Sequence, residues 1–142
     1  MFPSHDHGAL DNGTIANVTG DGTVYTVVFG SSTFNIGSDY DDSTTYTAPI
    51  DGKYLFKCKI HATGASTSNT LLTLAFVTTS QTYTLVRVDP AGWVSTGGTV
   101  GVDMDLFVEL SSGDTVEVDL TVSGGSQVVD INFYGFFGAL IA

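Results

Sequence analysis

The chain has 142 residues and a net charge of −11, from 4 basic and 15 acidic side chains, and this length suits one ordinary domain. Hydrophobic residues make up 42% and charged residues 13%, so the chain can bury a core and does not fit the disordered class. So few cations disfavour binding to nucleic acid or to anionic membranes, and a single cysteine excludes an intrachain disulfide framework. Thr, Val, Ser and Gly outnumber the strong helix formers, which predicts an all-β domain.

Residues 1–22 are polar and rich in Gly, Asn and Asp, and they show neither a helical nor a strand period. We expect an extended N-terminal arm that anchors the protein to a larger assembly. Its apolar anchoring residues are Met1, Phe2, Pro3, Leu10 and Ile15. The start also lacks the charged and apolar regions of a signal peptide, so we expect synthesis in a cytoplasm.

Short strand patterns with turn residues between them fill residues 23–142, which we expect to form one domain. The clearest covers residues 53–62, where even positions are apolar and odd positions mostly polar, with Leu55 as an apolar exception. The same alternation over 100–110 and 115–122, around a Ser-Ser-Gly-Asp turn, predicts a hairpin, with Phe107 as its exception. Weaker strand patterns cover 24–29, 71–78 and 83–88. Such a series predicts a β-sandwich or jelly roll.

The closing strand, residues 129–141, is apolar on both sides. One side carries Ile131, Phe133 and Phe137, and the other carries Tyr134, Phe136 and Leu140. A strand with one face in water would not show this pattern, so we expect a partner sheet to cover one face and another subunit the other. The alternative is a central strand covered by loops. The predicted interface residues are Leu55, Phe107, Tyr134, Phe136 and Leu140.

Three segments resemble C1q-like domains, in the order that the family has them. Residues 46–56 (YTAPIDGKYLF) resemble the aromatic-Thr-x-Pro-x-x-Gly-x-Tyr-x-Phe segment, residues 110–116 (LSSGDTV) the Leu-x-x-Gly-Asp-x-Val segment, and residues 136–141 (FFGALI) the closing Phe-Ser-Gly-Phe-Leu-Leu strand. In the closing strand Phe137 stands where the family usually has Ser, and Ala139 where it has an aromatic residue. The resemblance spans about 120 residues.

This resemblance implies a ten-stranded C1q/TNF-like jelly roll assembled as a homotrimer. C1q-like modules also occur in bacteriophage proteins, which join a particle without a secretion signal. The expected location is therefore a virion assembled in a host cytoplasm.

Catalysis is not expected, because the chain has no Gly-x-Ser-x-Gly turn, no phosphate-binding loop followed by Lys, and no His-Glu-x-x-His helix. Cys58 shares the apolar side of its strand, which predicts a buried, unreactive thiol.

Two groups of residues have metal-binding chemistry. His5 and His7 could place six imidazoles on a three-fold axis and hold a transition metal, the alternative being a solvated pair. Asp39, Asp41 and Asp42 offer oxygen ligands for calcium, the alternative being a solvated acidic turn. The expectation is no cofactor, with these two sites as possibilities.

Two functions remain open. The first is a trimeric capsid decoration or cement protein, held on the major capsid protein or another virion protein by residues 1–22. The alternative is the receptor-binding tip of a tail fibre or spike. In that case Trp93 and Tyr40 are the candidate contacts for a host glycan or protein, although Trp93 could equally cap the sandwich.

Overall fold

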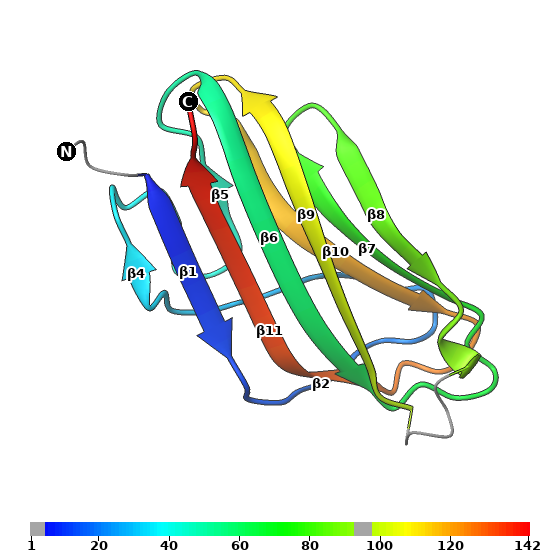
Figure 1. Ribbon diagram of the computed structural model, residues 1–142. Coiled ribbons are helices and arrows are strands. Elements are labelled where there is room, and N and C mark those ends of the chain that lie inside the picture. Colours follow the sequence, from blue (N-terminus) through cyan, green and yellow to red (C-terminus); the bar gives the residue numbers. More distant parts are fainter. Residues whose placement is uncertain (1–4, 93–97) are drawn as a thin grey trace.

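Two antiparallel β-sheets pack face to face in the computed structural model, which describes residues 5–92 and 98–142 (Figure 1). No helix in these ranges is long and apolar enough to cross a membrane. In chain order the strands are β1 (Asp6–Asp11), β2 (Ile15–Thr19), β3 (Val24–Thr26), β4 (Phe34–Asn35), β5 (Tyr46–Thr47), β6 (Gly52–Thr63), β7 (Leu71–Thr78), β8 (Thr82–Val88), β9 (Val100–Leu110), β10 (Thr115–Ser123) and β11 (Val129–Leu140).

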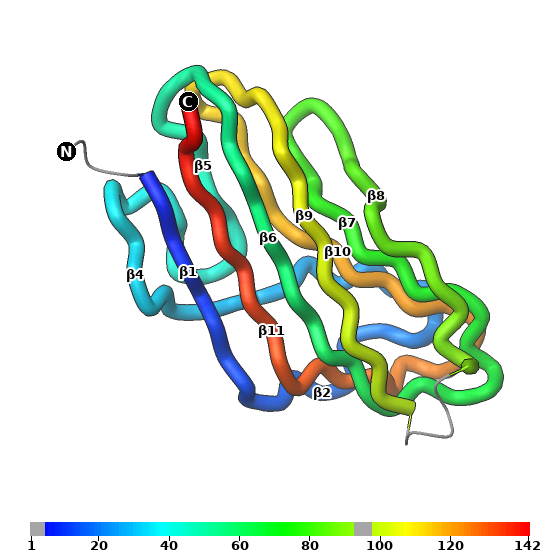
Figure 2. Tube along the Cα trace, in the orientation of Figure 1, coloured from blue at the N-terminus to red at the C-terminus, as the bar shows by residue number. Residues whose placement is uncertain are grey.

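The closing strand β11 organises the larger sheet. This six-stranded sheet has the order β4-β1-β11-β6-β9, and β2 also pairs with β11. The five-stranded sheet has the order β3-β10-β7-β8, and β5 also pairs with β10. In Figure 2, β11 runs between β1 and β6; it pairs with β1 from Tyr134 to Ala139 and with β6 from Asp130 to Leu140. The expected all-β, two-sheet sandwich is confirmed.

The core lies between the sheets and is built from the even-numbered residues of β6, β9 and β10, as their alternation predicts. Its centre is an aromatic cluster around Phe136, which is fully buried. The ring of Phe136 lies 5.1 Å from that of Phe29, 6.1 Å from Phe56 and 6.3 Å from Phe76. Burial of each such side chain contributes about 1.5–3 kcal/mol.

The expected arm over residues 1–22 is wrong for residues 6–19. These residues form β1 and β2, both paired with β11, so the sandwich begins before residue 23. In β1, His7 and Ala9 point into the core and are 1% and 0% exposed. The sequence hides this strand because histidine and alanine are weakly apolar, and backbone pairing rather than hydrophobic pattern holds the segment. The predicted anchor residues Met1, Phe2 and Pro3 lie outside the described residues.

The predicted hairpin between residues 100–110 and 115–122 is also wrong. Strand β9 pairs with β6, whereas β10 pairs with β7, β3 and β5 in the other sheet. The turn between them therefore crosses from one sheet to the other. It is tied to the preceding loop, because Gly113 N–H donates to the Ala48 carbonyl and Ala48 N–H to the Asp114 carbonyl, each over 2.8 Å. Alternation reports which side of a strand is buried, but not which strand is its partner.

Gly138 of β11 makes room for the rings on either side of it. It lies opposite His7 on β1 and Phe56 on β6. A Cβ atom at this position would lie 2.7 Å from the Phe56 ring and 2.9 Å from the His7 ring. Both rings are buried, so neither can move into solvent.

Replacing Gly138 with Ala should lower the free energy of unfolding by about 1–3 kcal/mol, the usual cost of overpacking a core. The matched control is Gly92→Ala, where an added Cβ would have no atom of residues 5–92 or 98–142 within 4 Å, its chain neighbours aside. Urea denaturation of the two variants measures the difference. Equal stabilities would contradict the packing described here.

Candidate self-association face

The six-stranded sheet has one side that faces away from the five-stranded sheet, and we call this side the outer face. Near the C-terminal end of β11, Ala139, Leu55 and Phe107 form one row across β11, β6 and β9. Phe107 is 61% exposed, the largest value for any large apolar side chain in the described ranges. The apolar side chains of the outer face are Leu10, Phe34, Leu55, Phe107, Phe133, Phe137 and Ala139.

Two glycines let the aromatic side chains lie directly against the backbone of this sheet. A Cβ atom on Gly8 would lie 2.5 Å from the ring of Phe34 and 3.1 Å from that of Phe137. One on Gly135 would lie 2.9 Å from Leu10 and 3.0 Å from the Phe137 ring. The outer face therefore carries a packed apolar layer.

Three depressions open on the outer face. The first, of about 190 Å³, has mainly apolar walls. The second, also of about 190 Å³, is lined mainly by charged side chains of β6 and β9. The third, of about 280 Å³, lies at the β1 end, beside Leu10, Asn12 and Phe133. The walls of the first depression are Phe34, Leu55, Phe137, Gly138 and Ala139, with Asp6, His7 and Lys57.

Charges balance across the β6–β9 half of the outer face. Every lysine of the chain stands on β6, directly opposite an acidic residue of β9. The closest described pair, Lys57 Nζ and Asp105 Oδ1, is 3.8 Å apart and more than half exposed, so it adds little stability to a single chain. This half of the face is neutral on a chain of net charge −11. The pairs are Lys53–Glu109, Lys57–Asp105 and Lys59–Asp103.

The predicted interface residues divide between the two sides of the sheet. Leu55 and Phe107 lie on the outer face, as expected. Tyr134 and Phe136 do not: they are 5% and 0% exposed and point into the core, and Leu140 packs against the core as well. A β-bulge between Ile131 and Phe133 is the reason. It inserts one residue, so the side-chain parity of the strand reverses after Ile131.

The outer face includes residues that sequence reasoning missed. By simple alternation, Phe133 and Phe137 fall on the side of the strand opposite the predicted interface residues, and the bulge brings them to the outer face. Leu10, which is 47% exposed, was assigned to the arm. Phe34 had no signal at all, because β4 is two residues long and shows no period.

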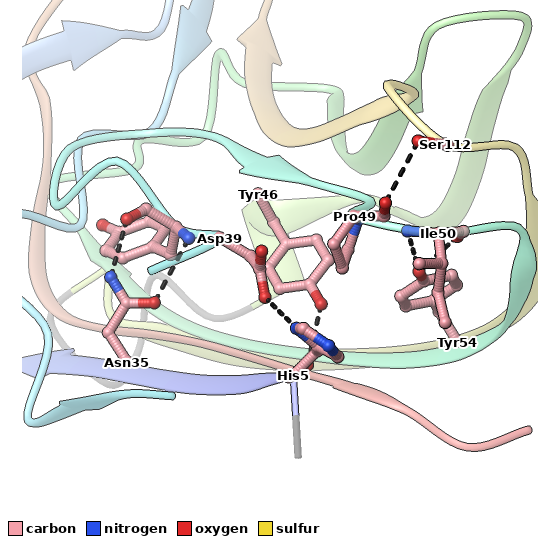
Figure 3. A network of polar contacts seen from close by, with 9 residues as sticks. His5, Asn35, Asp39, Tyr46, Pro49, Ile50, Tyr54 and Ser112 are labelled. Atoms are coloured by element: carbon pink, nitrogen blue, oxygen red, sulfur yellow. Dashed lines mark hydrogen bonds and ion pairs between the residues drawn. The ribbon is translucent and has the colours of Figure 1, made fainter. Parts of the chain in front are cut away.

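The histidine pair is divided between two environments and does not form the predicted metal site. His5 Nδ1 lies 2.8 Å from Asp39 Oδ2, and the Tyr46 hydroxyl donates to the His5 carbonyl over 2.7 Å (Figure 3). His7 is buried instead, and its ring stacks 4.7 Å from Tyr40 and 5.1 Å from Tyr46. An imidazole enclosed by rings cannot reach a metal shared between chains.

The three aspartates of the predicted calcium loop also have separate partners. Asp39 faces His5, and Asp41 accepts hydrogen bonds from the backbone of residues 43, 44 and 45 at 2.9–3.0 Å. Asp42 accepts from the hydroxyl and backbone N–H of Ser32, which lower the pKa of its carboxyl group. These carboxylates fix loop geometry, and no group of three metal-ligating side chains occurs in the described ranges.

Of the two candidate receptor contacts, the structure describes Tyr40, and this residue is not exposed. Tyr40 is 3% exposed, and its hydroxyl donates to the carbonyls of Gly30 and Ser43 over 2.6 and 2.9 Å. The prediction for Tyr40 is therefore wrong, and Trp93 lies outside the described residues. Cys58 is buried as predicted, and burial raises the pKa of its thiol, so a reactive thiolate is disfavoured.

Solved structures with the same architecture are known, although no protein-family model and no curated protein sequence matches this chain. The globular domain of zebrafish complement 1qA is 18% identical, with a TM-score of 0.70 over 99% of this chain and 98% of that one. Murine APRIL is 13% identical, with a TM-score of 0.56 over 96% and 98% of the two chains. Vertex protein P5 of bacteriophage PRD1 is 12% identical, with a TM-score of 0.64 over all of both chains.

Likeness at this level of identity concerns the fold. The chain has a C1q/TNF-like jelly-roll fold, as the three sequence segments indicated, and shares it with the phage vertex protein. Domains with this fold typically form homotrimers and are generally non-catalytic.

His7 gives a prediction about pH. Burial lowers its pKa from 6.5 to about 4, because the charged form loses its hydration. As the pH falls from 6.5 to 4, the unfolded chain binds a proton before the folded chain does, so stability falls over this window. The free energy of unfolding of His7→Phe should therefore fall by about 3 kcal/mol less than that of the parent between pH 7 and pH 4. Denaturation of both proteins at pH 7 and pH 4 measures the difference.

The stability and the pH dependence of His7→Phe both test the burial of this imidazole. The variant should be at least as stable as the parent at pH 7, because neither nitrogen of His7 has a hydrogen-bond partner in the described ranges. An unchanged pH dependence in His7→Phe would contradict the assignment of the buried group.

Proposed function

We propose that this protein is a non-enzymatic, homotrimeric structural protein of a virus-particle surface. The observation that carries the trimer is the outer face. It is apolar and packed, with Phe107 exposed on it and with no net charge on its β6–β9 half. Exposed apolar patches of this kind are typical of interaction sites. A second copy fits better than a charged partner, because a chain of net charge −11 can approach itself there without strong repulsion.

The particle context draws support from vertex protein P5, which matches this chain over the full length of both. Within this proposal, the favoured role is a decoration or cement protein on a phage head. Its attachment to the major capsid protein cannot depend on a free arm of 22 residues, since residues 6–19 are strands of the sandwich. Attachment would therefore use the folded surface, and three copies would bind with the avidity of a trimer.

The second candidate is host attachment at a vertex or a tail tip. The description of P5 as a vertex protein favours it. Because Tyr40 is buried, residues other than Tyr40 would have to contact the receptor.

Electron microscopy of labelled particles tests the particle role. Antibody to the chain should label particles from its source, over the whole head for a decoration protein and at vertices or tail ends for host attachment. Particles without label would contradict the virion proposal, while the trimer would still stand or fall on its own measurement.

That measurement is sedimentation equilibrium. The chain should sediment at three times its mass of 14.9 kDa, and Leu55→Asp should sediment as a monomer, because it places a charge within the apolar layer. The matched control is Leu85→Asp on β8, a 46% exposed leucine of the other sheet, which should stay trimeric. A trimeric Leu55→Asp variant would contradict the assigned face.

A further inference from the structure

The outer face carries one protruding side chain and one apolar hollow. Phe107 protrudes from β9, the edge strand of the sheet. The hollow is the first depression, walled by Phe34, Leu55, Phe137 and Ala139. Its volume of about 190 Å³ exceeds the roughly 150 Å³ of a cavity that binds benzene, so a phenyl ring fits it.

The two features do not meet within one chain, because Phe107 is 61% exposed and is not among the residues that line the hollow, although it adjoins the Leu55 wall. Phe107 and Ala139 stand in the same row with Leu55 between them, two strand spacings apart. At about 4.8 Å per strand the separation is about 10 Å. Phe107 of one chain is therefore available to the hollow of another.

The symmetry of a trimer requires this kind of contact. In a closed three-fold ring each subunit presents one patch to one neighbour and a different patch to the other. The protruding side chain lies on the edge strand, while the hollow lies toward β4 at the opposite edge. One chain can therefore present both at the same time.

The chemistry of the walls selects among the depressions. The second depression is lined by Lys57, Lys59, Asp103 and Asp105, and the third by Asp11 and Asn12 beside its apolar residues. The first depression also has Asp6 and Lys57 at its wall, but its walls are the most apolar of the three. A benzyl group that leaves water gains most in such a site.

We infer that Phe107 of each chain inserts into the Phe34–Leu55–Phe137–Ala139 depression of the next chain and fixes the order of subunits around the three-fold axis. This contact rests on the proposed trimer and specifies its partner surfaces. The occupant is a second copy of this chain, in accordance with the neutral β6–β9 half that adjoins the contact.

A double-mutant cycle on the trimer association constant tests the contact. Phe107→Ala removes the inserted ring, and Ala139→Phe fills the depression from within its own chain. Each single variant should lower the association constant at least tenfold per contact, the scale of an interface anchor residue. In the double variant the depression is filled by the ring introduced at position 139 of its own chain, and no ring from a neighbour competes for it. Its association constant should therefore be at least tenfold higher than the value expected if the two single effects were independent.

Controls make the result specific. Leu85→Ala combined with Ala139→Phe should be additive, because Leu85 lies on the other sheet. The same double-mutant cycle, measured on the free energy of unfolding of the separated chains, should show no coupling between positions 107 and 139. Coupling in that measurement would indicate a contact within one chain. Where Ala139→Phe does not fold, Ala139→Leu fills the depression in its place.

The outcomes divide clearly. Coupling that occurs in the association constant but not in the free energy of unfolding supports the insertion of Phe107 into the neighbouring chain. Additive losses in a parent that is trimeric overturn this contact and leave the proposed trimer standing. A parent chain that is monomeric at every concentration overturns the proposed trimer itself.

Discussion

The structure depends on one constraint: β11 must bury both of its faces. It lies between β1 and β6, its inner side forms the aromatic centre of the core around Phe136, and its outer side carries Phe133 and Phe137. The five-stranded sheet covers only the inner side. A strand with two apolar faces satisfies this constraint when a second layer covers the outer one, and a neighbouring chain can provide that layer.

The same constraint explains the glycines and the charges around the strand. Gly138 leaves space for rings in the core, whereas Gly8 and Gly135 leave space for rings on the outer face. Lysines of β6 are matched by acids of β9, so the apolar layer is bordered by a region without net charge. Of the other acidic residues, Asp6 and Asp11 border depressions of the outer face, and the net charge of −11 favours solubility.

Much of the fold could be predicted from alternation and from the three segments that resemble C1q-like domains, because β6, β9 and β10 each bury nearly all of their even-numbered residues. The exposed layer was partly predictable, since Leu55 and Phe107 break that alternation. Three things could not be predicted. The bulge after Ile131 reverses the side-chain parity of β11 and leaves no signal in the composition. Backbone pairing rather than a hydrophobic pattern holds β1. The partner of β9 depends on a turn that crosses between the sheets. Periodicity contains none of this information.

The central claim is that another copy of the chain covers the outer face. Hydroxyl-radical footprinting with mass spectrometry, performed over a range of protein concentrations, measures the solvent access of single side chains. The account predicts that oxidation of Phe107 and Phe137 falls as concentration rises, while oxidation of Leu85 on the other sheet stays constant. Oxidation of Phe107 and Phe137 that stays high at every concentration would contradict the claim.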